Sequence, residues 1–341
     1  MQPELSLSIC IPNYKRLNQL IELIHSINNA SKLCNGNYEI IISDDFSPNQ
    51  EVIKNEIYKL KSEIEIPIKI YLNSRNIGYD ANLRSLINKS SKNYITLFGN
   101  DDLMPNDFFV NFSHLMNKYN FPKAIIRSYA TFNKNKENII SSFVYTPKDT
   151  LLSPSPDTLA YIFKRSVVIS GLIFERKISK NLFSKKYDGL LLYQVYLISK
   201  ISLLGNVCLT NKILAYYRLN GIPEFGTSEN ESFHTPGKRT VNSSISFIRG
   251  LLLIAREVSP NKRTFKKILI DLSKYSYPII SIQNDLKFID RIKYSKSLSD
   301  LGLSCTPYFF LYVIVYVVKL TRPFEFIVEI IKKKLGYTPK L

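Results

Sequence analysis

Short apolar runs alternate with helical segments in the N-terminal part of the chain, and this alternation restricts the fold more than any other feature. The runs are rich in β-branched residues and lie at 5–11, 38–43, 66–72 and 94–98. Between the first two, apolar residues recur at the spacing of one helix face over 17–27. Strands that alternate with helices form an α/β domain with a mainly parallel central sheet, which is the predicted fold class.

Polar residues follow the carboxyl end of each run. They lie at 12–16, 44–45, 76–84 and 100–102. Ligands of open α/β sheets bind in the crevice beyond the carboxyl ends of the strands. We therefore expect these four groups to converge on one cleft. The glycine patterns of Rossmann and P-loop sites, GxGxxG and GxxxxGK[ST], are absent from the sequence, so neither kind of site is predicted.

The fourth run ends in two adjacent carboxylates, Asp101 and Asp102, and Pro105 then prevents simple continuation of the strand. Close like charges at the end of a buried strand repel each other and need a cation or polar partners. A divalent metal that carries a phosphate is one such partner, because hard cations prefer carboxylate oxygens. A solvated turn that caps the following helix is the other interpretation. Both remain open from these residues alone.

The second half of the chain begins with the same kind of pattern. Strands are predicted at 124–132, 167–174 and 207–218, and an apolar helix at 190–204. A long polar loop follows at 220–238, and loops of this length without regular structure are often functional. We predict that it forms a mobile flap. Its acids and its histidine are Glu224, Glu229, Glu231 and His234.

Beyond this loop the pattern is helical, with predicted helices at 244–257, 262–275 and 285–296. We therefore divide the chain into an α/β domain, residues 1–236, and a helical C-terminal region, residues 237–341. The C-terminal region holds 19 Lys and Arg against 7 Asp and Glu, so most of the net charge of +18 lies there. A basic surface suits nucleic acid, nucleotide phosphates or anionic lipid.

An apolar, aromatic segment at 308–318 stands close to this basic charge. It has eleven uncharged residues, well short of the roughly 20 that span a bilayer. The lysine run 332–334 follows it. This combination suits peripheral attachment to an anionic membrane surface. A buried core helix with a solvated basic tail is the alternative.

Composition narrows the classes of protein and partner. Hydrophobic residues make up 45% of the chain, an ordinary globular value that argues against disorder. The N-terminal residues lack the pattern of a signal peptide, and the four scattered cysteines fit reduced thiols, so a cytoplasmic location is expected. No RRM, KH, zinc-finger or helix-turn-helix signature is present, so nucleic acid is not an expected partner and a nucleic-acid-binding protein is the less favoured alternative.

Four motifs in order, SICIPNYKR, EIIISDDFSP, NIGYDANLR and ITLFGNDDLMP, resemble those of the family 2 glycosyltransferases with a GT-A fold. The GYDANL and GNDD forms are similar to the abequosyltransferase-type members of O-antigen and capsule assembly. A looser similarity continues at 170–174 and 214–218. The resemblance implies a GT-A fold for residues 1–236, followed by a helical region without a motif of the family.

The resemblance assigns the polar strand ends to a nucleotide-diphosphate sugar donor. Arg16 would meet a phosphate, and Asp44 and Asp45 would meet the base and the ribose. A solvated turn is the alternative for the two acids, and helix capping is the alternative for Asp80. The implied donor-binding residues are Pro12, Asn13, Tyr14, Arg16, Asp44, Asp45, Asn76, Gly78, Asp80, Asn82, Arg84 and Asn100.

The stretch 99–102 corresponds to the family's metal-binding element, usually Asp-Ser-Asp-Asp. Asp101 falls on the metal-ligating position and Asp102 follows it, whereas Gly99 replaces the first acid. The implied cofactor is Mg²⁺ or Mn²⁺, held by one or two carboxylates, with diphosphate and water as its other ligands. Such an ion acts as a Lewis acid on the leaving diphosphate.

Family members of this type invert the anomeric centre, which requires a general base for the acceptor hydroxyl. The family's base lies in a Glu-Asp pair shortly before an apolar helix. That pair is absent here, and Asp188 is the candidate, with an N-cap role as the alternative. Gln194 falls close to the position of the family's acids. Arg218 and His234 are candidates for contact with the diphosphate or the metal once the flap closes.

The resemblance thus implies a metal-dependent inverting glycosyltransferase. It would transfer a sugar to a hydroxyl of a saccharide or lipid-linked saccharide acceptor in the synthesis of a bacterial surface polysaccharide, as a cytoplasmic enzyme with a possible peripheral membrane contact. The missing first acid leaves a second hypothesis, a catalytically silent protein that binds a sugar nucleotide or serves as a scaffold in the same pathway.

Overall fold

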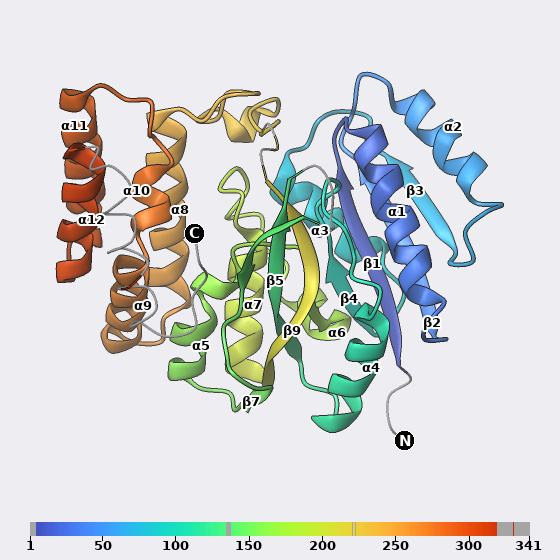
Figure 1. The fold of residues 1–341 in the computed structure, drawn as a ribbon. Helices are drawn as coiled ribbons and strands as arrows, with labels where there is room; N and C mark the ends of the chain where they lie inside the picture. Colours follow the sequence, from blue (N-terminus) through green and yellow to red (C-terminus); the bar gives the residue numbers. More distant parts are fainter. Residues whose placement is uncertain (1–4, 134–137, 220, 222, 319–329, 331–341) are drawn as a thin grey trace.

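The computed structural model describes residues 5–133, 138–219, 221, 223–318 and 330 (Figure 1). Within these residues the strands form one sheet with the order β3-β2-β1-β4-β8-β5-β9-β7, and β6 pairs with β5. The first four strands are β1 (Ser6–Asn13), β2 (Asn37–Asp44), β3 (Ile68–Leu72) and β4 (Tyr94–Leu97). They run parallel to one another, which confirms the predicted α/β class with a mainly parallel sheet.

The second half of the chain extends this sheet. β8 (Leu172–Glu175) runs antiparallel between β4 and β5 (Ala124–Phe132), and β9 (Val207–Arg218) runs parallel to β5. β7 (Thr150–Leu152) pairs with β9 at the edge, and β6 (Ile139–Phe143) pairs with β5. These five strands all lie beyond β4, so β4, the strand that precedes Asp101 and Asp102, has β1 on one side and β8 on the other.

The predicted strand 167–174 is wrong in its first part. Residues 167–170 form a turn, and the strand begins only at Leu172. Gly171 has φ 76°, a left-handed conformation that interrupts a strand, and its N–H donates to the Leu97 carbonyl at 2.9 Å. The turn before Gly171 is consequently held at the carboxyl end of β4.

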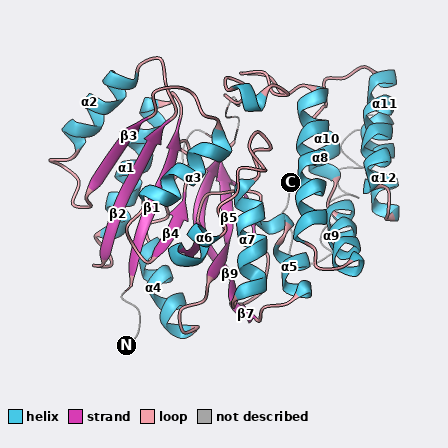
Figure 2. Ribbon diagram, turned by 180° about the vertical axis from the view of Figure 1, so that it is seen from behind, coloured by secondary structure: helices cyan, strands magenta, loops and turns pink. Residues whose placement is uncertain are grey.

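Helices cover both faces of the sheet. α1 (Leu17–Ser31) contacts α4 (Phe108–Lys118) on one face, and α2 (Gln50–Leu60) packs beside β3. On the other face, α3 (Tyr79–Lys89), α6 (Arg176–Asn181) and α7 (Tyr193–Leu204) follow one another, as Figure 2 shows. In α1 the apolar stripe expected from the sequence is buried, because it faces the sheet.

The C-terminal region forms a block of helices beside the sheet (Figure 1). α9 packs against α5, and α8 against α7, so its buried apolar residues join the hydrophobic core of the α/β domain. The boundary at residue 237 remains a prediction. α5 (Pro156–Ile162) belongs to the α/β domain. The helices of the C-terminal region are α8 (Val241–Val258), α9 (Lys262–Lys274), α10 (Tyr277–Ser281), α11 (Phe288–Leu298) and α12 (Pro307–Val318).

α12 contains the apolar segment noted in the sequence. One face is buried through Phe309, Tyr312, Val315 and Tyr316, as a core helix requires. The other face exposes apolar side chains, among them Ile314 at 54%. Within the described part of the chain, no helix has both the length and the apolar character needed to cross a bilayer. The lysine run 332–334 lies outside the described residues.

Candidate active site

A cavity of about 680 Å³ lies at the carboxyl ends of the parallel strands. All four predicted polar groups contribute to its wall, so the predicted convergence is confirmed. The predicted donor-binding and metal residues that line it are Pro12, Asn13, Tyr14, Arg16, Asp45, Asn76, Asn82, Asn100, Asp101 and Asp102. The predicted residues that are not part of the wall are Asp44, Gly78, Asp80, Arg84 and Asp188.

Asp44 lies behind the cavity and joins three strand ends. It is fully buried and accepts hydrogen bonds from Asn13 Nδ2 at 2.7 Å and from both the N–H and the hydroxyl of Ser47. Asn13 Oδ1 in turn accepts from Asn100 Nδ2 at 2.7 Å. The chain Asp44–Asn13–Asn100 thus fixes the ends of β2, β1 and β4 relative to one another.

Asp45 faces the cavity and holds the segment after β3. Its carboxylate accepts from the N–H groups of Ile77 and Gly78, both at 2.9 Å, and from Asn73 Nδ2 at 2.9 Å. Burial raises the pKa of the Asp45 carboxyl, although these three donors oppose the shift. Gly78 has φ 85°, and a side chain there would lie 2.7 Å from Ser228 Oγ, so glycine is required at this position.

Asp80 has a structural role that its motif did not predict. It is 1% exposed and accepts from the N–H groups of Leu191, Leu192 and Tyr193 at 2.8–2.9 Å. These three donors lie at the start of α7. The first N–H groups of a helix lack acceptors within the helix, and Asp80 supplies acceptors for them. Burial raises the pKa of Asp80 to about 7. Asp80 therefore caps a helix, but α7 rather than its own.

Arg84 and Asp188 form a bidentate salt bridge. Arg84 Nη2 lies 2.6 Å from Asp188 Oδ2, and the second nitrogen pairs with Oδ1. The guanidinium is buried, with the rings of Phe183 and Tyr193 each 5.4 Å from its centre. The predicted phosphate-binding residue and the predicted general base thus contact each other, and neither belongs to the cavity wall.

The two acids after β4 have different surroundings. Asp101 lies at the cavity and pairs with Arg16, whose Nη1 is 2.5 Å from Asp101 Oδ2. Asp102 is 2% exposed and accepts from the Ser170 hydroxyl and from the Arg218 N–H at 2.9 Å. Burial, reinforced by the charge of Asp101, raises the pKa of the Asp102 carboxyl. Asp101 is consequently the more accessible of the two for a metal.

The acid-bearing turn is fastened to β9. Leu103 and Tyr216 exchange two backbone hydrogen bonds of 2.9 Å, and Arg218 Nε donates to the Asp101 carbonyl at 2.7 Å. Gly99 fits closely in this turn, because an added Cβ would lie 3.1 Å from Asp102 Oδ2. A carboxylate at position 99, as in the family's usual pattern, would therefore lie beside the buried carboxyl group of Asp102.

The described part of the polar loop lies over the strand ends. Glu231 is buried and accepts from the N–H groups of Tyr79 at 2.7 Å and Gly226 at 2.9 Å. Glu224 pairs with Lys15 at 3.0 Å. His234 lines the cavity and is half-buried, and burial lowers its pKa. The sequence predicted a mobile flap in this loop but did not indicate which of its acids form the hydrogen bonds and salt bridges that hold it.

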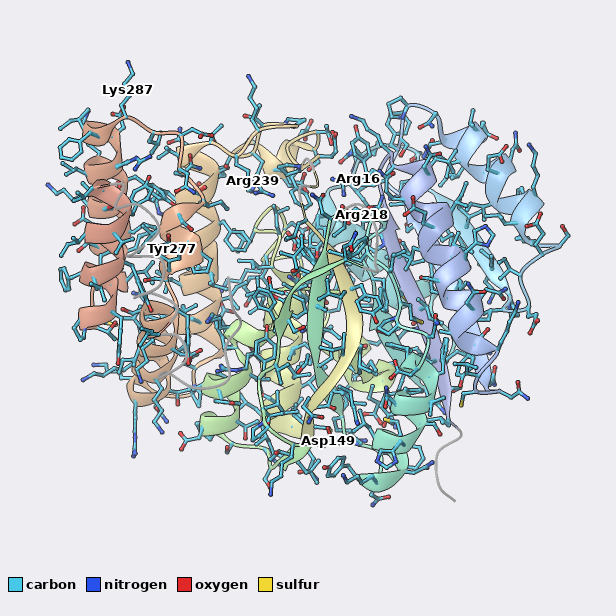
Figure 3. The ribbon with its side chains drawn as sticks, in the orientation of Figure 1. Arg16, Asp149, Arg218, Arg239, Tyr277 and Lys287 are labelled. Carbon is cyan, nitrogen blue, oxygen red and sulfur yellow. The ribbon has the colours of Figure 1, made fainter. Side chains whose placement is uncertain are left out.

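Gln194 was noted in the sequence only for its position. The structure buries it in the cavity wall, where Nε2 donates to the Val167 carbonyl at 2.8 Å. Its Oε1 has no partner among the described residues. Figure 3 shows Arg16 and Arg218 at the carboxyl end of the sheet, and Arg239, from the start of the helical region, at the same end of the molecule.

The described residues contain no cluster of three or more His, Cys, Asp or Glu side chains that could hold a metal. A divalent ion at Asp101 would therefore take most of its ligands from a diphosphate and water. The expected set of one or two protein carboxylates stays a prediction, and Mg²⁺ is often bound in this way with substrate phosphates.

The chain was compared with known proteins. The model of the family "Glycosyl transferase family 2" matches residues 8–170. The abequosyltransferase RfbV of Salmonella typhimurium strain LT2 is 35% identical over 101 residues, which cover 30% of this chain and 29% of RfbV. The match thus spans less than a third of that relative.

Solved structures extend the likeness to most of the fold. Staphylococcus aureus TarS 1–349 superposes with a TM-score of 0.57 at 12% identity, over 87% of this chain and 80% of TarS 1–349. Its complex with UDP-GlcNAc gives 0.59 over the same shares. At this identity the likeness concerns the fold alone. Residues 8–170 thus match the model of glycosyl transferase family 2, and the chain has a GT-A-like fold with a helical C-terminal region.

Proposed function

We propose that this protein transfers a sugar from a nucleotide-diphosphate donor to a hydroxyl of a saccharide acceptor in the synthesis of a bacterial surface polysaccharide. One observation carries the proposal. Four strand-end segments, far apart in sequence, meet at one cavity with Asp45 in its wall and the Asp101–Arg16 pair beside it. The family of residues 8–170 and the similarity to an abequosyltransferase support sugar transfer as the reaction.

The donor would lie along the strand ends. Asp45, preorganised by the backbone of residues 77 and 78, would accept hydrogen bonds from the base or ribose. Arg16 would bind the diphosphate, since a guanidinium matches phosphate oxygens. Asp44, Asp80 and Asn100 would act by holding these elements in place. Gly78 would permit the close approach of the flap.

A Mg²⁺ or Mn²⁺ ion would be held by Asp101 together with the donor's diphosphate. When bound, the ion would supply Lewis-acid polarisation of the leaving group. We assign Asp102 to holding the turn, because its two oxygens already accept from Ser170 and Arg218. In this proposal Asp101 is the protein's single carboxylate ligand.

Inverting transfer requires a group that takes the acceptor's proton as the new bond to the anomeric carbon forms and the bond to the diphosphate breaks. Each acid in the cavity wall already has a partner: Asp45, Asp101, Asp102, Glu224 and Glu231. The His234 imidazole has no hydrogen-bond partner among the described residues, and its lowered pKa keeps it neutral at pH 7. We therefore propose His234 as the general base in place of Asp188, which is paired with Arg84.

The test is a screen of nucleoside diphosphates and sugar nucleotides by thermal shift, with and without Mn²⁺. A donor that binds the folded state raises the melting temperature by mass action. Purified protein with the selected donor should then release nucleoside diphosphate when a saccharide acceptor is added. Binding without turnover would instead support the silent sugar-nucleotide-binding protein, and no shift with any nucleotide would overturn both.

The acceptor is proposed to be lipid-linked and reached at an anionic membrane surface. The support is the exposed apolar face of α11 and α12. Exposed side chains on it are Phe288, Ile289, Ile292, Phe310, Ile314 and Val318, and Lys287, Lys293 and Lys296 accompany them. Apolar side chains beside lysines bind anionic lipid surfaces.

A further inference from the structure

The helical region completes the cavity with a wall that a nucleotide sugar does not require. It contributes apolar side chains from α8, α10 and α11, namely Phe247, Ile248, Pro278, Ile279, Ile282 and Tyr294. The ribose, diphosphate and sugar of a sugar nucleotide are polar, and we assign their contacts to the strand ends on the opposite wall. Apolar side chains in a pocket wall can pack against an apolar part of a ligand.

Two cations stand at the start of this wall. Lys238 and Arg239 line the same cavity and are exposed. Neither forms a salt bridge with an acid within the described ranges. They directly precede Thr240, the N-cap of the 18-residue helix α8. Cations beside a helix N-terminus form a setting that favours a phosphate group.

The face of α8 that lines the cavity is polar near the start of the helix and apolar one turn further along. Ser243 and Ser244 line the cavity one turn into the helix, and Phe247 and Ile248 line it one turn further. Residues at such three- and four-residue spacings share a face. At 1.5 Å per residue, the first helical residue, Val241, and the apolar pair are separated by about 10 Å along α8. This order matches a phosphate joined to a hydrocarbon chain.

The apolar end of the cavity opens outward. Ile282, just beyond α10, is 44% exposed. α10 packs against α12, and α11 packs against both α8 and α12, within the helical block seen in Figure 1. On α11, Phe288 and Ile289 are 62% and 55% exposed. A chain longer than the cavity could therefore leave it toward the apolar face that we assign to the membrane surface.

We propose that α8 and α10 form the subsite for the lipid part of the acceptor. Lys238 and Arg239 bind the phosphate that joins the saccharide to the lipid. The apolar wall that includes Phe247 and Ile282 binds the first carbons of the hydrocarbon chain. The proposal rests on the proposed function and names the acceptor as a lipid-phosphate-linked saccharide. In this proposal the helical region recognises the acceptor, and the strand ends on the opposite side of the cavity bind the donor.

The experiment uses the absence of tryptophan from the sequence. Phe247→Trp introduces a single tryptophan, whose fluorescence reports the apolar wall. Dodecyl phosphate, below its micelle concentration, is expected to shift the emission and to bind at least tenfold more tightly than inorganic phosphate or the uncharged dodecyl maltoside. Calorimetry on the unmodified protein with the same three probes provides a second measurement that does not depend on the variant's folding.

Two further variants test the two ends of the subsite. Lys238→Ser with Arg239→Ser, and separately Ile282→Asp, should each weaken dodecyl phosphate binding at least tenfold. Val52→Asp on α2, 52% exposed and away from the cavity wall, is the matched control and should change nothing. The thermal shift with nucleotide should persist in the Ile282→Asp variant.

Three outcomes would overturn the proposal. Dodecyl phosphate that binds no better than inorganic phosphate would show a simple anion site. Binding equal to that of dodecyl maltoside would show a non-specific apolar contact. Loss of the nucleotide shift in the Lys238/Arg239 double variant, without dodecyl phosphate binding to the parent protein, would assign the two cations to the donor and would leave the proposed function intact.

Discussion

Asp101 and Asp102 are neighbours in sequence, yet their side chains have opposite environments. Asp101 contacts Arg16 at the cavity, whereas Asp102 is buried against Ser170 and the backbone of Arg218. A turn directs consecutive side chains to different sides, so a motif of two acids does not reveal which acid is accessible. Substitutions of the two should consequently have different effects.

Asp101→Ala is expected to reduce transfer about 100-fold or more, the scale of losing one electrostatic contact to a transition state. It should also abolish the effect of Mn²⁺ on the donor-induced thermal shift. Steady-state rates measure the first effect, and donor-induced thermal shifts with Mn²⁺ or with EDTA measure the second. Asp107→Ala, which removes an exposed acid six residues later, is the matched control. Full activity of Asp101→Ala would contradict the metal assignment.

His234→Gln is expected to lower kcat by about 100-fold or more, as for removal of a general base, with little change in the KM for the donor. The acidic limb of the pH–rate profile, which reports the depressed pKa of the imidazole, should disappear. Asp188→Asn should instead lower the urea midpoint, because it removes the charge that pairs with buried Arg84. The opposite pattern, with kcat lost only in Asp188→Asn, would restore Asp188 as the base.

At this scale the sequence located the right segments but not the direction of each side chain. The motif around Asp80 and Arg84 predicted donor contacts, and the structure instead shows a cap for α7 and a partner for Asp188. Both partners lie about 100 residues away in sequence. Contacts between such distant residues depend on tertiary packing, which a local pattern does not encode.

At the scale of the elements, one carboxylate ties the amino ends of the sheet. Glu39 on β2 accepts from Ser8 of β1 at 2.7 Å, from Lys69 of β3 at 2.9 Å and from Ser91 before β4 at 2.7 Å. Burial favours the neutral form of Glu39, but these donors outweigh it and lower its pKa to about 2. The folded protein therefore prefers this group ionised.

The lowered pKa gives a pH dependence with a defined sign. The contribution of Glu39 to stability is fully present above its ordinary pKa of 4.5 and is lost as the pH falls from 4.5 toward 2. Glu39→Gln should be less stable than the parent by about 3 kcal/mol at pH 7, and this difference should shrink below pH 4.5. Urea unfolding at pH 7, 4.5 and 3 measures it, with Glu63→Gln, an exposed acid, as the control. A constant difference across this range would contradict the assignment.

The predictability of the elements follows from how local their causes are. β1 to β4 and α1 were predictable, because each has its own apolar pattern. The turn 167–170 was not, since its residues are as apolar as a strand. Its shape depends on Gly171 and on Arg127, a buried residue that donates to the carbonyls of Arg165, Val168 and Ser170.

At the scale of the whole molecule, the sequence predicted two regions but not that they share a cavity. α8 and α10 have ordinary amphipathic patterns, and a buried face looks the same in sequence whether it meets a core or a ligand. That the helical region forms one wall of the cavity therefore became apparent only from the structure. The choice between core helix and membrane contact for α12 resolved only in part, since the helix has a buried face and an exposed apolar face.

The exposed apolar face of α11 and α12 leads to a prediction about the whole protein. Phe310→Asp with Ile314→Asp should reduce co-sedimentation with vesicles that contain anionic lipid at least tenfold, because two exposed apolar side chains are replaced by negative charges. High salt should release the parent protein, as screening weakens attraction between exposed charges. Val110→Asp on α4, 44% exposed, is the control. A parent protein that never binds such vesicles would refute the membrane contact.

The Arg16–Asp101 ion pair has a consequence for the order in which ligands load. An ion that takes Asp101 separates it from Arg16, and a diphosphate that takes Arg16 separates it from Asp101, so each ligand alone must displace an existing contact. Bound together, the two ligands give each residue a new partner of opposite charge. By linkage, each then raises the affinity for the other by the same factor. Mn²⁺ alone should therefore raise the melting temperature only slightly, whereas the ion and the nucleotide together should raise it strongly. The Arg16–Asp101 pair would then produce positive heterotropic cooperativity between metal and donor.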